Sequence, residues 1–215
     1  MSIQYCAIIG DINNSRQLER RGSIQVRFKR AIRTINTEFE SEIASPFMIT
    51  LGDEFQGLLS SPVRSYRLAR RLQDLMEPVP FAFGIGIGNL ETPLNRREPL
   101  GMDGPCFHNA RKALLLAKKN KNEIRYQFDD PAGELVNAIV ISLDKQWQQL
   151  SENQREILKR RKEGMTQLAI AKKLHITKQA VSKSAKTGLV KEMNAAVDAL
   201  ESYLVRYRMS NKSTI

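Results

Sequence analysis

Two adjacent acidic residues, Asp53 and Glu54, stand between two short apolar segments of the sequence. The segments 47–51 and 55–59 are apolar, β-branched or aromatic, and Gly52 with Asp53 supplies turn chemistry. The sequence therefore predicts a β-hairpin that carries both carboxylates at its tip. Like charges about 4 Å apart repel by roughly 4 kcal/mol at an effective dielectric constant near 20. A divalent cation, an arginine or a raised pKa would each offset this repulsion.

A third carboxylate, Asp11, follows the apolar run 5–9 and is expected at the end of a buried strand. If this strand lies beside the hairpin, Asp11, Asp53 and Glu54 converge on one oxygen-rich site. Carboxylate oxygens are the ligands that Mg²⁺ prefers, and Mn²⁺ accepts the same set. The sequence therefore predicts a divalent metal site at this end of the sheet.

The elements that position these residues follow a strand, helix, hairpin, helix, strand, helix, strand order. This order predicts an α+β sandwich with a ferredoxin-like βαββαβ core, extended by one helix and one strand, and with helices on one face of a mainly antiparallel sheet. In segment 81–88, large apolar residues alternate with Ala and Gly, so one face of that strand is bare. A bare face indicates the close approach of a ligand, another backbone or a partner molecule. The predicted helices span residues 22–39, about 62–76 and 106–119, and the last strand spans 124–128.

Composition indicates a globular protein without a membrane partner. The 41% of apolar residues can fill an ordinary core, and the longest apolar runs are only as long as strands. Residues 1–11 have no basic segment and no cleavage site, so we expect no signal peptide and a cytoplasmic location. The formal net charge is +11, and more than half of it lies in residues 131–215. A basic segment of this kind is typical of nucleic-acid binders, although many basic segments are only solvated helix faces.

The first domain resembles the palm-like nucleotidyl-transferase superfamily. Gly52-Asp53-Glu54-Phe55 is similar to the hairpin motif of diguanylate cyclases, although Leu51 replaces the first glycine of that motif. Gly10-Asp11-Ile12 resembles the first metal-binding strand of class III nucleotide cyclases. The resemblance implies a nucleotide cyclase-like fold in which two divalent cations orient a nucleoside triphosphate.

The same resemblance implies roles for individual residues. Asp11 and Asp53 become metal ligands, and Glu54 becomes a metal ligand or an assisting base. In the run 101–111, Asp103 would read the base, while Asn109 and Arg111 would stabilise the transition state. Further nucleotide contacts are expected from polar residues in the loop after the first strand and on the first turns of the helix 106–119, where the helix N-terminus attracts phosphate. These residues are Ser15, Arg16, His108 and Lys112.

A closer resemblance covers nearly the whole chain. Four runs, Gly-Asp-Ile-x-x-Ser-Arg, Thr-Leu-Gly-Asp-Glu-Phe-Gln-Gly, Phe-Gly-Ile-Gly-Ile-Gly and Gly-Met-Asp-Gly-Pro, resemble the bacterial SatD family. This family implies the architecture of the chain more than its activity.

The C-terminal part is predicted to be a small all-α domain. Ser151 and Gln154 form a capping-box pattern, Gly164 ends the first helix, and Thr166 caps the second. The run 167–183 resembles the helix-turn-helix of sigma-factor region four, which implies binding of double-stranded DNA through the major groove. A protein-docking helical hairpin is the alternative. The expected DNA contacts are Thr177, Lys178, Gln179, Ser182, Lys183 and Lys186.

The predicted domain boundaries place the palm-like domain at residues 1–130, a connecting helix at 131–150, the helix-turn-helix domain with a C-terminal helix at 151–208, and a disordered tail at 209–215. Four apolar residues on the C-terminal helix repeat at spacings of four, three and four. This stripe either pairs with a second copy, giving a homodimer, or packs on its own chain. The four residues are Met193, Val197, Leu200 and Leu204.

Three functions are open from the sequence, and the first is favoured because the hairpin carboxylates are intact whereas the transition-state residues match the cyclase pattern poorly. The first is a bacterial DNA-binding transcription regulator whose palm-like domain binds a divalent metal and a nucleotide ligand. The second is an enzyme, a Mg²⁺-dependent nucleotide cyclase or nucleotidyltransferase. The third is a DNA-binding protein whose degenerate palm serves for dimerisation.

Overall fold

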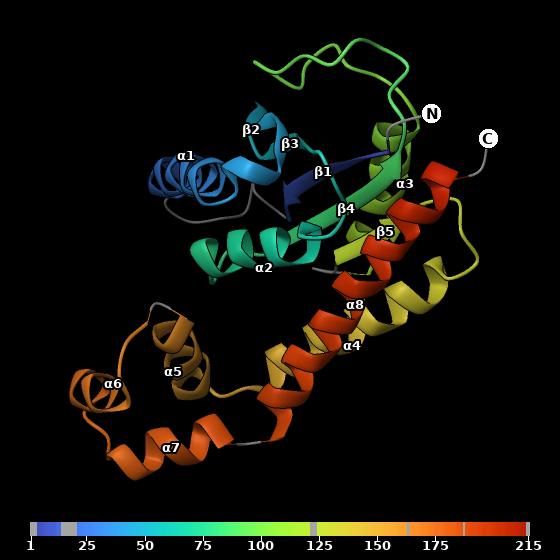
Figure 1. Cartoon of the computed structure of the whole chain (residues 1–215). Helices are drawn as coiled ribbons and strands as arrows, with labels where there is room; N and C mark the ends of the chain where they lie inside the picture. Colours follow the sequence, from blue (N-terminus) through green and yellow to red (C-terminus); the bar gives the residue numbers. More distant parts are fainter. Residues whose placement is uncertain (1–3, 14–20, 121–123, 163, 187, 214–215) are drawn as a thin grey trace. The chain divides into compact units, whose positions relative to one another are not determined.

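The structure is a computed structural model that describes residues 4–13, 21–120, 124–162, 164–186 and 188–213 (Figure 1). It contains a mixed α+β part built on one five-stranded sheet and a smaller helical part. Among the described helices, none is long and apolar enough to cross a membrane.

The sheet has the strand order β2-β3-β1-β4-β5 (Figure 1). The central strand β1 is antiparallel to both β3 and β4, whereas β5 is parallel to β4. The first four strands, with the helices between them, form a ferredoxin-like core, and β5 is added at one edge as the sequence predicted. The strands are β1 Tyr5–Ile12, β2 Ile43–Leu51, β3 Glu54–Leu59, β4 Phe81–Gly88 and β5 Ile124–Gln127.

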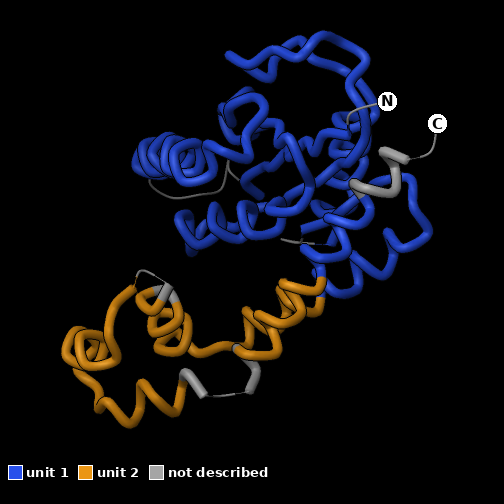
Figure 2. The backbone as a smooth tube through the Cα atoms, viewed as in Figure 1, with its two compact units in different colours: residues 1–141, 200–215 blue, residues 142–199 orange. Residues whose placement is uncertain are grey.

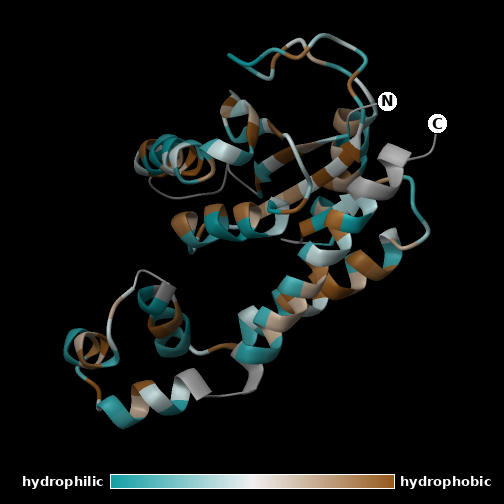
Figure 3. Cartoon of the chain, in the orientation of Figure 1, coloured by the Kyte–Doolittle hydropathy of each residue, from teal (hydrophilic) through white to brown (hydrophobic). Residues whose placement is uncertain are grey.

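Helices α1 (Arg21–Glu38) and α2 (Ser65–Met76) cover one face of the sheet. Phe28 of α1 packs edge-on against Phe55 and Phe81, with ring centroids 6.0 and 5.4 Å apart. α2 is strongly amphipathic, with apolar residues on the side that it buries and hydrophilic residues on the other (Figure 3). A short 3-10 helix, η2 (Glu40–Glu42), leads into β2.

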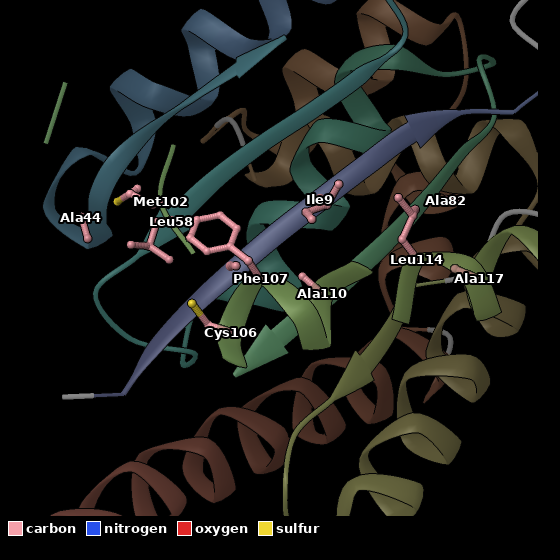
Figure 4. Packing of buried hydrophobic residues seen from close by; sticks show 11 residues of the cluster. Ile9, Ala44, Leu58, Ala82, Met102, Cys106, Phe107, Ala110, Leu114 and Ala117 are labelled. Carbon is pink, nitrogen blue, oxygen red and sulfur yellow. The ribbon is translucent and has the colours of Figure 1, made fainter. Parts of the chain in front are cut away.

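Helix α3 (Pro105–Lys119) covers the opposite face, so the prediction of helices on one face only was wrong. Because side chains alternate along a strand, Ala82 lies on the other face of β4 from Phe81 and Phe83. Ala82 belongs to a buried cluster with Ile9 and Leu58 from neighbouring strands and with Phe107 from α3 (Figure 4). The helix between β4 and β5 therefore crosses the face that the first two helices leave open.

The bare face of β4 is explained by α3. A Cβ atom on Gly84 would lie 2.1 Å from the Ala110 carbonyl oxygen, and one on Gly86 would lie 2.1 Å from the Ala110 nitrogen. Glycine at these positions lets the α3 backbone rest directly on the strand. Of the alternatives predicted for this face, close approach of another backbone is the one observed.

Both edge strands are capped by an asparagine side chain. Asn36 of α1 accepts from the Phe47 N–H and donates to the Phe47 carbonyl, both at 2.8 Å. Asn137 makes the same pair of bonds with Tyr126 of β5, at 2.8 and 3.0 Å. Each amide takes the place of one residue of a further strand, which reduces the tendency of a sheet edge to pair with another chain.

The chain divides into two compact units, residues 1–141 with 200–215 and residues 142–199 (Figure 2). Helices α4 and α8 each pass from one unit to the other, whereas α5, α6 and α7 lie within the second. The helix bounds are α4 Gly133–Gln149, α5 Glu152–Lys162, α6 Gln167–Leu174, α7 Lys178–Lys186 and α8 Gly188–Ser213.

The C-terminal part of α8 belongs to the first unit, which differs from the predicted boundary at residue 151. Arg67 of α2 donates to Glu201 at 2.6 Å and 3.2 Å, and the rings of Phe128 and Tyr207 lie 5.0 Å apart. These contacts attach residues from Leu200 onward to the sheet unit. α8 also continues to Ser213 because neither Gly nor Pro interrupts it, so the predicted disordered tail is helical as far as the structure describes it.

The apolar stripe on α8 packs within its own chain. Its four residues are 0–9% exposed, which leaves no free seam for pairing with a second copy through this stripe. A homodimer through another surface stays a prediction. The buried residues are Met193, Val197, Leu200 and Leu204.

Candidate functional site

The candidate site lies where β1 and β3 pair near the hairpin turn. In the strand register, Asp11 stands directly opposite Glu54. Both side chains lie on the α3 face because Asp11 is two residues from Ile9 and Glu54 is four residues from Leu58, and both apolar residues pack in the α3 cluster. The Asp11 and Glu54 side chains are only 12% and 13% exposed. Two mostly buried carboxylates are thus brought together, as the sequence predicted.

The hairpin turn is attached to the end of β1. The Ile12 N–H donates to the Asp53 carbonyl at 3.1 Å, and Gln25 of α1 donates to the Gly52 carbonyl at 2.5 Å. Gly52 has φ 59°, a conformation that glycine adopts without strain. This arrangement brings the negative charge of Asp53 near Asp11, where it adds to the rise in the pKa of Asp11 that burial mainly causes.

Helix α3 supplies two cations to the carboxylates. Arg111 binds Glu54 through two parallel hydrogen bonds, from Nη1 to Oε2 at 2.5 Å and from Nη2 to Oε1 at 2.8 Å. Lys118 donates from Nζ to Oδ2 of Asp11. Arg111 and Lys118 are seven residues apart, nearly two full turns, so they lie on one stripe of the helix. The short packing distance between α3 and the glycines of β4 determines how far these two basic side chains lie from the sheet.

The pKa of Asp11 is raised above its usual range. Burial is the main cause, because removal from water disfavours the charged form. The hydrogen bond and the charge of Lys118 act in the opposite direction, and the charges of Asp53 and Glu54 add to the rise. The pKa of the Arg111 guanidinium is also raised, chiefly by its hydrogen bonds to Glu54, which fixes its positive charge.

A family model described as the SatD family matches residues 5–197. The chain belongs to the SatD family. The resemblance found in the sequence motifs is thereby confirmed. A search of curated proteins gave no match.

Solved structures similar to this SatD-family chain include nucleotide cyclase domains. The guanylate cyclase domain of RhGC from Catenaria anguillulae, in complex with GTP, is 12% identical over 58% of this chain and 78% of that one, with a TM-score of 0.43. The dimeric guanylyl cyclase domain of RhoGC from Blastocladiella emersonii is 11% identical over 57% and 78%, with a TM-score of 0.43. The adenylyl cyclase CyaB from P. aeruginosa is 11% identical over 57% and 76%, with a TM-score of 0.43. The DNA-binding regulator predicted from the sequence is not supported by these comparisons, and DNA binding stays a prediction.

The predicted three-carboxylate metal cluster is not formed. Within the part of the chain that the structure describes, no group of three or more His, Cys, Asp or Glu residues is arranged to hold a metal ion. The physical reason is that α3 brings Arg111 and Lys118 onto the two carboxylates of the sheet. The donor chemistry nevertheless suits Mg²⁺, since Asp11, Asp53 and Glu54 offer only oxygen ligands.

The other residues predicted for the nucleotide are spread along α3 and its preceding loop. Asn109 donates to the Ile87 carbonyl of β4 at 2.9 Å, which is a structural contact between helix and sheet. His108 and Asp103 form an exposed pair at 2.8 Å, and Lys112 is exposed on the next turn. The contacts described for these side chains do not include Asp11 or Glu54. Two further predicted nucleotide contacts, Ser15 and Arg16, lie outside the described residues.

Lys118 is the site residue that sequence reasoning missed. Its seven-residue spacing from Arg111 was a readable signal, because residues two turns apart share one face of a helix. The run that resembles the cyclases ends at Arg111, so it does not include the last turn of α3. Only the tertiary structure shows that the last turn of this helix reaches Asp11, through the hydrogen bond from Lys118.

Proposed function

We propose that the sheet unit binds a nucleoside triphosphate together with a divalent cation, and that nucleotide cyclase or nucleotidyl-transfer chemistry is its activity. One observation carries the proposal: Asp11 and Glu54, facing each other across β1 and β3, are met by Lys118 and Arg111 from one stripe of α3. Carboxylates and cations in one mostly buried place provide partners for both halves of a metal–nucleotide complex.

The two residue types would divide the ligand between them. Asp11, Asp53 and Glu54 offer the oxygen atoms that a divalent cation requires. Arg111 offers a planar pair of N–H donors that matches phosphate oxygens, and Lys118 offers a mobile ammonium group. When bound, the cation would neutralise charge and align the reacting oxygens. The resemblance of Gly52-Asp53-Glu54-Phe55 to a cyclase hairpin motif favours nucleotidyl transfer over phosphate hydrolysis.

A melting experiment tests the binding. Ligand at one hundred times its dissociation constant stabilises by about 2.7 kcal/mol, which corresponds to a rise in Tm of about 5–10 °C for a chain of this size. We expect this rise with Mg²⁺ and one nucleotide of a panel, and we expect it to disappear in Asp53→Asn, which leaves the strand register intact. Lys29→Gln, a charge change on α1 at the opposite face, is the control and should respond as the wild type does.

An assay of product formation from ATP and GTP then tests the activity. Cyclic nucleotide or a nucleotidyl-transfer product, formed with release of pyrophosphate and lost in Asp53→Asn, is the expected result. The absence of any nucleotide-dependent rise in Tm would contradict the binding proposal. A rise in Tm without product would limit the function to nucleotide binding.

A second candidate function, binding of double-stranded DNA, rests on the geometry of the second unit. Helices α6 and α7 are joined by a three-residue turn in which His175 is left-handed, with φ 54°. The hydroxyls of Thr166 and Thr177 accept from the N–H groups of Ala169 and Ala180 at 3.2 and 3.0 Å and so cap both helices. Short capped helices joined by such a turn are typical of a helix-turn-helix.

The helices of this unit enclose a small core, made of Ile157, Ile170, Ala171 and Val181. The capping box predicted for α5 is present, since Ser151 and Gln154 exchange two hydrogen bonds at 2.8 and 3.2 Å. Thr177 therefore has a structural role as a cap in addition to its proposed contact. Among the other proposed DNA contacts, Lys178, Gln179 and Lys183 are exposed and Ser182 is half-buried. The side chain of Lys186 lies outside the described residues.

Fluorescence anisotropy with duplex DNA tests this second function. Each lost phosphate contact should lower the slope of log K against log salt by about one. We expect this loss in Lys178→Gln and in Lys183→Gln, whereas Lys172→Gln on the exposed side of α6 serves as the matched control. Equal slopes in all four proteins would contradict DNA binding through α7. If both functions hold, the nucleotide should change the DNA affinity, and DNA should change the nucleotide affinity by the same factor.

A further inference from the structure

The two carboxylates of the site are mostly buried on paired strands, whereas their two cations reach them on long and partly exposed side chains. Asp11 and Glu54 lie within paired strands, with side chains 12% and 13% exposed. Lys118 and Arg111 reach them on long side chains that are 39% and 45% exposed. A long basic side chain at a helix surface can turn its charged end into water at small cost, but a carboxylate on a central strand cannot leave its place. The mobile members of the site are therefore the basic ones.

We propose that Lys118 and Arg111 are exchangeable counter-ions, which neutralise Asp11 and Glu54 in the ligand-free protein and transfer to the phosphates when a metal–nucleotide complex binds. This inference rests on the proposed function, and it adds a rule for ligand binding. The metal takes over the carboxylates at the same time as the polyphosphate takes over the basic side chains.

The existing hydrogen bonds explain why a metal ion alone should bind weakly. Arg111 uses both carboxylate oxygens of Glu54, and Lys118 uses Oδ2 of Asp11. A divalent cation must displace these two charges, and without a nucleotide they gain only water in return. Charge-assisted hydrogen bonds are stronger than neutral ones, so this competition is substantial.

A nucleotide alone meets the corresponding obstacle. If phosphates draw Arg111 and Lys118 away, Asp11 and Glu54 are left as uncompensated charges that are nearly buried, which is costly. Metal and nucleotide should therefore bind cooperatively, each removing the penalty that the other meets. The site would therefore bind the metal–nucleotide complex more tightly than either component alone. This selectivity does not come from net charge, because the charges of Asp11, Glu54, Lys118 and Arg111 sum to zero.

Titration with Mn²⁺ alone tests the exchange, with the free ion followed by its electron paramagnetic resonance signal at pH 8. The proteins are the wild type, Lys118→Met, Arg111→Met and the control Lys29→Met. We expect weak binding in the wild type and the control, and binding at least about tenfold tighter in the two α3 variants, the equivalent of one charge-assisted hydrogen bond. Lys118→Gln and Arg111→Gln repeat the measurement if either methionine variant fails to fold.

A second titration uses non-hydrolysable ATP and GTP analogues in the presence of saturating Mn²⁺. Here the wild type should bind the analogues more tightly than the α3 variants do, because the variants lack the groups that receive the phosphates. If the wild type binds the metal–nucleotide complex but the α3 variants bind Mn²⁺ no more tightly than the wild type does, the counter-ion exchange is overturned and the proposed function stands. Failure of every protein to bind either Mn²⁺ or the analogues would instead overturn the proposed function.

Discussion

Replacing Gly86 by alanine tests how closely α3 must rest on the sheet. The new Cβ would lie 2.1 Å from both the Ala110 nitrogen and the Cys106 carbonyl oxygen, and an ordinary contact begins at 3.4 Å. Strand and helix must therefore separate by about 1.3 Å, because two backbone atoms cannot rotate away as a side chain would. Overpacking of this kind costs about 3 kcal/mol, and alanine recovers about 0.5–1 kcal/mol of backbone entropy. The expected net loss is at least about 2 kcal/mol.

Thermal denaturation followed by circular dichroism measures this loss as a fall in Tm of about 4–8 °C. The control is Gly22→Ala in α1, where an added Cβ meets nothing within 4 Å and a small gain in stability is expected. A lifted α3 also carries Arg111 and Lys118 away from their carboxylates, so Gly86→Ala should bind Mn²⁺ alone more tightly than the wild type. If Gly86→Ala melts within 1 °C of the wild type, the packing argument for the bare face of β4 fails.

Three further predictions concern the site, the sheet edge and the second unit. In Asp11→Asn, the free energy of unfolding, measured by urea denaturation, should rise relative to that of the wild type as the pH increases from 3.5 to 7. Because the pKa of Asp11 is raised in the folded wild type, the folded chain holds this proton more tightly than the unfolded chain does. The wild type therefore loses stability as the pH rises above the ordinary pKa of aspartate, whereas asparagine does not ionise. A variant whose advantage shrinks over this range would contradict the sign of the shift. Asn36→Ala should cost about 1–3 kcal/mol, because it leaves the Phe47 N–H and carbonyl without their partners, and light scattering should detect concentration-dependent association through the uncovered edge. Val181→Ala should cost about 2 kcal/mol by opening a cavity in the small core of the second unit, and hydrogen exchange should quicken in α6 and α7 while that of β1 stays unchanged.

Local patterns were sufficient to predict most elements and the position of the hairpin carboxylates. Gly52 and Asp53 form the predicted turn, and Thr166 is the N-cap of α6. The requirement for a partner near Asp53 and Glu54 was also predictable, because close like charges need compensation. Of the three kinds of partner considered for this pair, the structure shows an arginine, Arg111, at Glu54.

The predictions that failed depended on contacts between segments far apart in the sequence. Lys118 is 107 residues from Asp11, and no local pattern states that the last turn of α3 reaches the first strand. The attachment of Glu201 to Arg67, 134 residues away, likewise moved the end of α8 into the sheet unit. A boundary drawn from helix periodicity cannot include such pairs.

The sequence by itself determined the elements, the family and the two carboxylates that meet across β1 and β3. These follow from the period of apolar residues, from turn and cap chemistry, and from motifs whose letters lie close together. Only the tertiary structure decided that α3 covers the glycine face of β4 and that its cations neutralise Asp11 and Glu54. The physical reason is that an alternating strand shows which residues share a face, whereas the element that covers that face is selected by the packing of the whole chain.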